Sequence, residues 1–179
     1  MNKQQKQWKS TRQIVLVALF IALSAAGALI KVPSPTGTVA LDALPAFLAT
    51  LLLGGFPGAI VGFLGHMASA VTAGFPLTIP IHLLVGALMA VIMLICGVIA
   101  RKIHPVAAMA AGIVLNGVGA PAAFILIPKF GMVFFTSMVL PLTVGSAINI
   151  IIAGILYYSL RKTKIVKSWQ ETRNGKQEA

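Results

Sequence analysis

The sequence predicts an all-α integral membrane protein with six transmembrane helices and both termini in the cytoplasm. Composition is the first reason, because 58% of the 179 residues are hydrophobic and 9% are charged, whereas about 25% are charged in soluble domains. Mean hydropathy is +0.96. The second reason is that residues 13–30, 43–100, 103–128 and 130–160 contain no Asp, Glu, Lys or Arg. A membrane helix needs about 20 apolar residues, so each of these stretches can cross a bilayer.

The longest uncharged stretch is divided by glycine and proline. The segments GGFPG (54–58) and AGFPLTIP (73–80) mark turns, and they split this stretch into three helices. The first of the three is short. We expect it to be tilted, or to be preceded by non-helical chain that is buried in protein, where such chain is tolerated. The six predicted helices cover about residues 12–31, 42–55, 57–73, 79–100, 105–126 and 133–160.

Positive charge predicts the orientation. With six spans and both termini inside, twelve of the 14 Lys and Arg lie on the cytoplasmic side, as the positive-inside rule requires, and only Lys31 and Lys129 lie outside. Residues 1–11 then form a basic N-terminal tail, 12–160 the membrane domain and 161–179 a basic C-terminal tail. The net charge of +11 is explained by contact with anionic lipid, without nucleic acid. The first helix lacks a signal-peptide cleavage site, so we expect it to be retained.

The sequence argues against catalysis. Cys96 is the one cysteine, so the chain has neither an internal disulfide nor a CxxC pair. It has no GxxxxGK[ST] phosphate loop, so it does not hydrolyse ATP by that route. One carboxylate at a helix end, without a metal-ligating cluster or a GxSxG turn, makes an intramembrane enzyme a weak alternative. We expect no catalytic residue, metal or cofactor.

Small residues form two stripes at helical spacing. Ala18, Ala22 and Ala26 recur every four residues in ALFIALSAAGA, and such faces let helices approach closely. Spacing alone leaves two interpretations open, packing inside the protein's own bundle or docking on another protein. For Gly58 and Gly62 in the third helix, internal packing is the expectation.

Several polar side chains lie within or beside the predicted helices, where an ionisable group costs about 2.5–3.5 kcal/mol at the helix centre. At a rise of about 1.5 Å per residue, they fall at compatible depths in the outer half of the bilayer. Ser146 and Asn149 lie deeper on the last helix, and we expect them to hydrogen-bond between helices. One cavity open to the outside can therefore be lined by Lys31, Asp42, His66, His82, Asn116 and Thr143.

Each of these groups also has a structural alternative. Asp42, the one acidic residue outside the C-terminal tail, can be the N-cap of the second helix, with Pro45 in the first turn. His82 can lie at the membrane interface, and Asn116 can join two helices.

The loop before Asp42 has its own chemistry. Its SPTGT segment (34–38) offers the hydroxyl groups of Thr36 and Thr38 beside prolines that restrict the backbone. A stiff polar loop of this kind suits a lid over a binding cavity.

These features together resemble a known family. Six spans in fewer than 200 residues, the ALFIALSAAGA face, the PSPTGTVALDALP loop and the GFPGAIVGFLGH segment resemble the substrate-binding S-components of energy-coupling factor (ECF) vitamin transporters. The resemblance covers residues 12–160. Within the family, the PTGTVALD loop is most similar to the proposed α-ribazole transporters of Gram-positive bacteria, which salvage a cobalamin precursor.

The resemblance implies partners and a site. An S-component captures a micronutrient outside the bacterial membrane and docks on a membrane coupling protein, the T-component, which is served by two cytoplasmic ATPases. The family's alanine face contacts that coupling protein, and here it corresponds to Ala18, Ala22 and Ala26. The substrate lies under the first loop and the loop between helices 3 and 4, which are residues 31–42 and 73–80 here.

α-Ribazole suits the residue types. Its benzimidazole can stack on Phe75 or His82, and Asp42 can accept a ribose hydroxyl. Pantothenate and a pyrimidine or thiazole precursor of thiamin stay open, although an anion should prefer Lys31. A proton-coupled secondary transporter that uses Asp42 and His66 is the alternative from another class, but the chain lacks the paired broken helices typical of many transporters.

Overall fold

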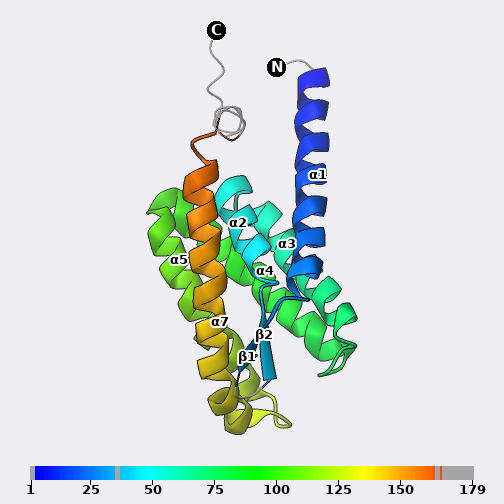
Figure 1. The fold of residues 1–179 in the computed structure, drawn as a ribbon, viewed down its shortest axis with the longest axis vertical. Coiled ribbons are helices and arrows are strands. Elements are labelled where there is room, and N and C mark those ends of the chain that lie inside the picture. Colours follow the sequence, from blue (N-terminus) through cyan, green and yellow to red (C-terminus); the bar gives the residue numbers. More distant parts are fainter. Residues whose placement is uncertain (1–2, 35–36, 164–165, 167–179) are drawn as a thin grey trace.

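The protein is a bundle of helices with one small hairpin (Figure 1). The computed structural model describes residues 3–34, 37–163 and 166, without the side chains of 3–10 and 31–39. In chain order the elements are α1 (Lys3–Gly27), β1 (Lys31–Ser34), β2 (Gly37–Ala40), α2 (Leu44–Leu53), α3 (Gly55–Thr72), α4 (Ile79–Lys102), α5 (Pro105–Val114), the π-helix η1 (Leu115–Gly119), α6 (Ala120–Ala123), the 3-10 helix η2 (Phe124–Leu126) and α7 (Gly131–Leu160).

The six predicted helical segments are confirmed within the described residues, with the fifth built from α5, η1, α6 and η2. The end of the first helix was predicted wrongly. It ends at Gly27 rather than near Lys31, because β1 begins at Lys31 and pairs antiparallel with β2. The segment expected as a stiff polar loop therefore contains a two-stranded antiparallel pairing.

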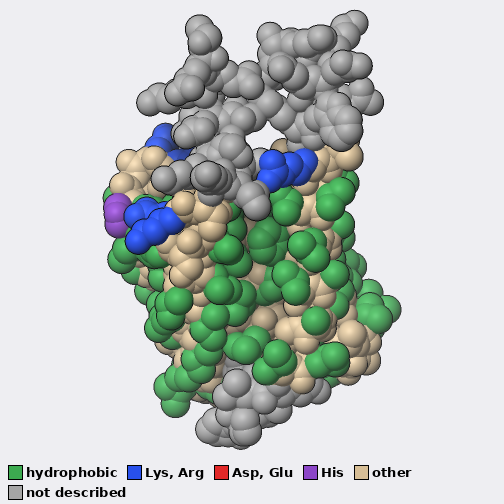
Figure 2. Space-filling view, turned by 45° about the horizontal axis from the view of Figure 1, so that its top comes forward, with side chains coloured by type: hydrophobic (Ala, Val, Ile, Leu, Met, Phe, Trp, Pro, Cys, Tyr) green, Lys and Arg blue, Asp and Glu red, His purple; other side chains and the backbone are tan. Residues whose placement is uncertain are grey.

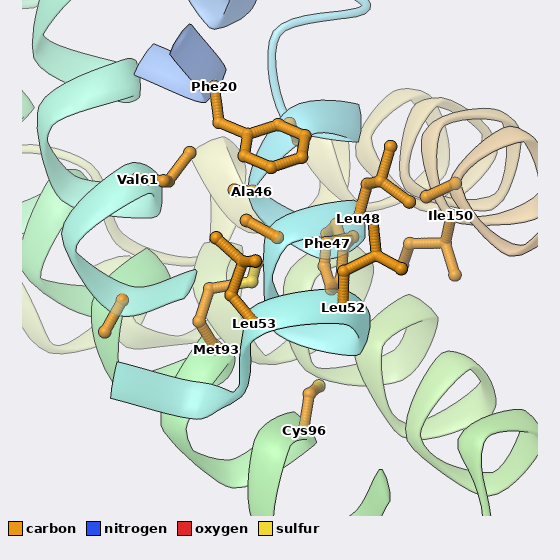
Figure 3. Packing of buried hydrophobic residues seen from close by; sticks show 14 of the residues in the cluster. Phe20, Ala46, Phe47, Leu48, Leu52, Leu53, Val61, Met93, Cys96 and Ile150 are labelled. Carbon is orange, nitrogen blue, oxygen red and sulfur yellow. The ribbon is translucent and has the colours of Figure 1, made fainter. Parts of the chain in front are cut away.

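Helix α2 forms the centre of the molecule. Eight of its 10 residues are buried, and a helix that is apolar on every face belongs in a core. Figure 3 shows Phe47, Leu48 and Leu52 of α2 among Phe20, Met93 and Ile150 from other helices. At about 1.5 Å per residue, α2 covers only half of the roughly 30 Å bilayer core.

Four helical segments are long and apolar enough to cross a membrane among the described residues. They are α3, α4, residues 105–126 and α7, while Thr11–Gly27 and α2 are shorter apolar helices. The prediction of a multi-pass membrane protein agrees with this arrangement.

Glycines bring α2, α3 and α4 close together. Gly54 has a φ of 107°, a left-handed value that favours glycine, and it is the single residue between the end of α2 and the start of α3. A methyl group on Gly58 would collide with Thr50 of α2, and one on Gly62 would press on Met93 of α4. The prediction of internal packing for Gly58 and Gly62 is confirmed.

Basic side chains gather at one end of the molecule. The start of α1 and the end of α7 lie at the same end in Figure 1, and the Lys and Arg visible in Figure 2 cluster there. Arg12, Arg101, Lys102, Arg161 and Lys162 are all exposed. The predicted grouping of these charges agrees with the fold, and the side of the membrane that they face stays a prediction.

Candidate functional site

A cavity of about 380 Å³ lies among the hairpin, α3, α4, the fifth helical segment and α7. Cavities of this size accommodate a small organic molecule. Its wall combines apolar groups with polar side chains, the latter being Asp42, His66, Ser69, Thr72, His82, Asn116, Ser146 and Asn149.

His66 and His82 form a pair in the wall of this cavity. His66 comes from α3 and His82 from the start of α4, and their Nε2 and Nδ1 atoms are 3.2 Å apart. The rings stack with centroids 5.3 Å apart. His82 also accepts a hydrogen bond from the Leu77 backbone N–H at 3.5 Å, and the Phe75 ring meets it edge-on with centroids 5.6 Å apart.

Asp42 lies in the turn between β2 and α2, outside the helices. Burial raises the pKa of its carboxyl group above the ordinary 3.8, while hydrogen bonds from the Ser69 hydroxyl and from the Asp42 and Ala43 backbone act in the opposite direction. The helix-cap interpretation is wrong, because the N-cap of α2 is Ala43 and no side chain of that residue caps the helix. Asp42 is thus a half-buried acid in the wall of the cavity.

Asn149 of α7 supplies the cap that Asp42 does not. Its Oδ1 accepts from the Leu44 backbone N–H at 2.8 Å, and its Nδ2 donates to the carbonyls of Ala40 at 3.0 Å and Gly145 at 2.8 Å. Both ends of the amide are engaged, so Asn149 ties the end of β2 and the start of α2 to α7. The expected role between helices agrees with this geometry.

Asn116 lies in the π-helix η1, a local widening that often occurs at functional sites. Its Nδ2 donates to the Ser146 hydroxyl at 2.8 Å, which leaves Oδ1 as an acceptor at the cavity wall. Thr143 lies elsewhere, because its hydroxyl donates to the Val139 carbonyl at 2.6 Å and its backbone packs against Gly117. Thr143 therefore joins helices rather than lining the cavity.

The structure brings together four of the predicted site residues, namely Asp42, His66, His82 and Asn116. Phe75 does not line the cavity but contacts His82 behind the wall. Thr36 and the side chains of Lys31 and Thr38 lie outside the described residues. A role in binding stays a prediction for all of these positions.

Sequence reasoning missed the aromatic part of the wall. Phe124 of η2 and Phe134 of α7 line the cavity with ring centroids 4.8 Å apart, and Phe130 packs against both. An isolated Phe in an apolar segment gives no signal that separates this position from lipid contact. Ser69 was also missed as a site residue, although its spacing of three residues from His66 places both on one helix face.

Helix α1 has two distinct faces. Phe20 and Ser24 are buried against the bundle, as is Ala28 directly after the helix, whereas Ala18, Ala22 and Ala26 are exposed. Packing inside the bundle is therefore excluded as the role of the alanine face.

The apolar helices and the cavity, with its apolar and polar wall, define a multi-pass membrane protein with room for a small molecule. Residues 12–161 match the family described as ECF transporter, substrate-specific component, and the chain belongs to this family. Members are transport subunits that capture a small molecule, while ATP hydrolysis lies in partner proteins. No curated protein and no solved structure matches the chain.

Proposed function

We propose that this protein is the high-affinity substrate-capture subunit of an ECF importer for a vitamin or vitamin precursor, with α-ribazole as the best candidate. The observation that carries the proposal is the cavity, which joins a hydrogen-bonding wall to an aromatic one. A ligand that suits it has a flat ring at one end and hydroxyl groups at the other.

α-Ribazole has this shape. Its benzimidazole is proposed to lie against Phe124 and Phe134, which line the cavity, because offset aromatic rings attract one another. Its ribose hydroxyls are proposed to donate to Asp42 and to Oδ1 of Asn116. The likeness of the PTGTVALD loop to the proposed α-ribazole transporters supports the same candidate.

The orientation and partners form the second part of the proposal. With the basic end in the cytoplasm of a bacterial cell, the hairpin and the adjoining cavity face outward. The exposed face of Ala18, Ala22 and Ala26 docks on the membrane coupling protein, which two cytoplasmic ATPases serve. Small side chains suit this role because they allow close helix approach.

Ligand identification tests the proposal directly. Small molecules released from the purified protein are identified by mass spectrometry, and the emptied protein is titrated calorimetrically with α-ribazole, pantothenate and the thiazole precursor of thiamin. We expect α-ribazole to bind most tightly. Tighter binding of pantothenate would overturn the α-ribazole assignment and favour a contact with Lys31.

A further inference from the structure

The histidine pair has a defined direction of hydrogen bonding. A backbone N–H can only donate, so the contact between Leu77 N and His82 Nε2 requires an unprotonated Nε2. A neutral imidazole carries one N–H, and the other nitrogen accepts. The proton of neutral His82 therefore lies on Nδ1.

The same reasoning applies to His66. With its proton on Nδ1, His82 donates to His66 Nε2, which is 3.2 Å away. The Nε2 atom of neutral His66 is then the acceptor, so its own proton lies on Nδ1. The opposite order would place the His82 Nε2 proton against the Leu77 N–H.

The Leu77 N–H belongs to the loop between α3 and α4, and this loop has an unusual backbone conformation. Phe75 has a φ of 51° and Thr78 a φ of 95°, in a region that non-glycine residues seldom occupy, and such strain is concentrated at functional sites. Thr78 N donates to the Phe75 carbonyl at 3.1 Å and His82 N to the Thr78 carbonyl at 3.1 Å. These bonds hold Leu77 and the His82 ring together.

We propose that His82 is a positioning residue that keeps the proton of His66 on Nδ1, so that His66 offers an N–H donor to the captured molecule. His66 lines the cavity, and its Nδ1 has no hydrogen-bond partner among the described residues. The matching ligand group is an acceptor, such as an unprotonated ring nitrogen or a hydroxyl oxygen. The ligand half of this inference rests on the proposed function, whereas the proton positions do not.

Nitrogen NMR of the ligand-free protein tests the proton positions. The chain has three histidines, and His104 is an internal standard because its Nδ1 accepts from the Val106 N–H at 3.2 Å, which places its proton on Nε2. With 15N-labelled histidine at mildly alkaline pH, where histidine is neutral, we expect Nδ1–H for His66 and His82 and Nε2–H for His104. Nε2–H on His66 would overturn the inference.

Two substitutions at His82 test its action on His66. His82→Asn keeps an amide donor near the position of Nδ1, whereas His82→Leu has a similar shape and no donor. We expect His82→Leu to give a mixture of His66 proton positions and to weaken α-ribazole binding by about fivefold to tenfold, the equivalent of one hydrogen bond. His82→Asn should retain most of the Nδ1–H form of His66 and most of the α-ribazole affinity.

The outcomes separate the two proposals. If the original protein does not bind α-ribazole, the ligand assignment fails, and the NMR result still decides the role of His82. If His82→Leu leaves the His66 signal on Nδ1, His82 is not the positioning residue. Equal losses in both variants, with unchanged His66 spectra, would reduce His82 to a packing role and contradict the inference.

Discussion

At the scale of single residues, two asparagines of the cavity wall have different tasks. Asn149 uses Oδ1 and Nδ2 within the protein, whereas Asn116 uses only Nδ2 with the residues that the structure describes. An amide with a spare carbonyl can bind a ligand, and one with no spare group holds the fold.

Replacing each asparagine by leucine separates these tasks. Asn149→Leu leaves the Leu44 N–H and the Ala40 carbonyl without their partner, so we expect it to lower the free energy of unfolding by about 1–3 kcal/mol. Asn116→Leu should weaken α-ribazole binding by a similar amount and melt closer to the original protein. Thermal melting and calorimetric titration in detergent measure the two effects, and the reverse pattern would contradict the assignment.

Substitutions at Asp42 can likewise separate an effect on stability from an effect on ligand binding. Because burial disfavours its charged form, Asp42→Asn should preserve ligand-free thermal stability. The same change should weaken α-ribazole binding by about 0.5–2 kcal/mol, since a hydrogen bond to a charged group is stronger than one to a neutral group. Asp42→Ala should lower the thermal stability as well as the affinity, because the Ser69 hydroxyl and the ligand then both lose their acceptor. Unchanged affinity in the Asn variant would remove Asp42 from the ligand contacts.

His66 is a third candidate ligand contact in the wall of the cavity. His66→Leu should weaken α-ribazole binding by about 1–3 kcal/mol if its ring donates to the ligand. Calorimetric titration measures the change. Unchanged affinity with a lower melting temperature would leave His66 a structural residue.

At the scale of elements, one face of α1 packs on the protein's own bundle, and the opposite face is available for contact with another protein. The buried face of α1, which includes Phe20 and Ser24, packs on the bundle, and its alanine face is exposed. Changes on the exposed face should therefore spare ligand binding and affect only contacts with another protein.

Ala22→Trp tests this separation. Tryptophan would prevent close helix approach, so we expect uptake in cells to be lost while α-ribazole binding to the purified protein is retained. Leu23→Trp is the matched control, because Leu23 is 46% exposed and points about 100° away from Ala22 around the same helix. Equal loss of binding and uptake in Ala22→Trp would contradict a docking role.

At the scale of the whole molecule, the family assigns ATP hydrolysis to partner proteins, so we expect transport to depend on them. In proteoliposomes, the isolated protein should bind α-ribazole but not accumulate it under a pH gradient. Accumulation should require the coupling protein, both ATPases and ATP. Accumulation by the isolated protein would instead favour the proton-coupled transporter.

The sequence alone determined the membrane class, the six helical segments and the grouping of basic residues. These properties depend on the apolar length of each segment and on the cost of placing charge in a bilayer, and both act locally along the chain. The resemblance of residues 12–160 to S-components agrees with the family match over 12–161.

Only the tertiary structure decided which side chains meet. The capping of Leu44 by Asn149 and the aromatic wall of Phe124 and Phe134 depend on how helices rotate against one another. Every face of a membrane helix can be apolar, because lipid is as apolar as a protein core. Hydrophobicity therefore cannot distinguish a face that meets lipid from one that lines a cavity, and contacts between distant segments make that choice.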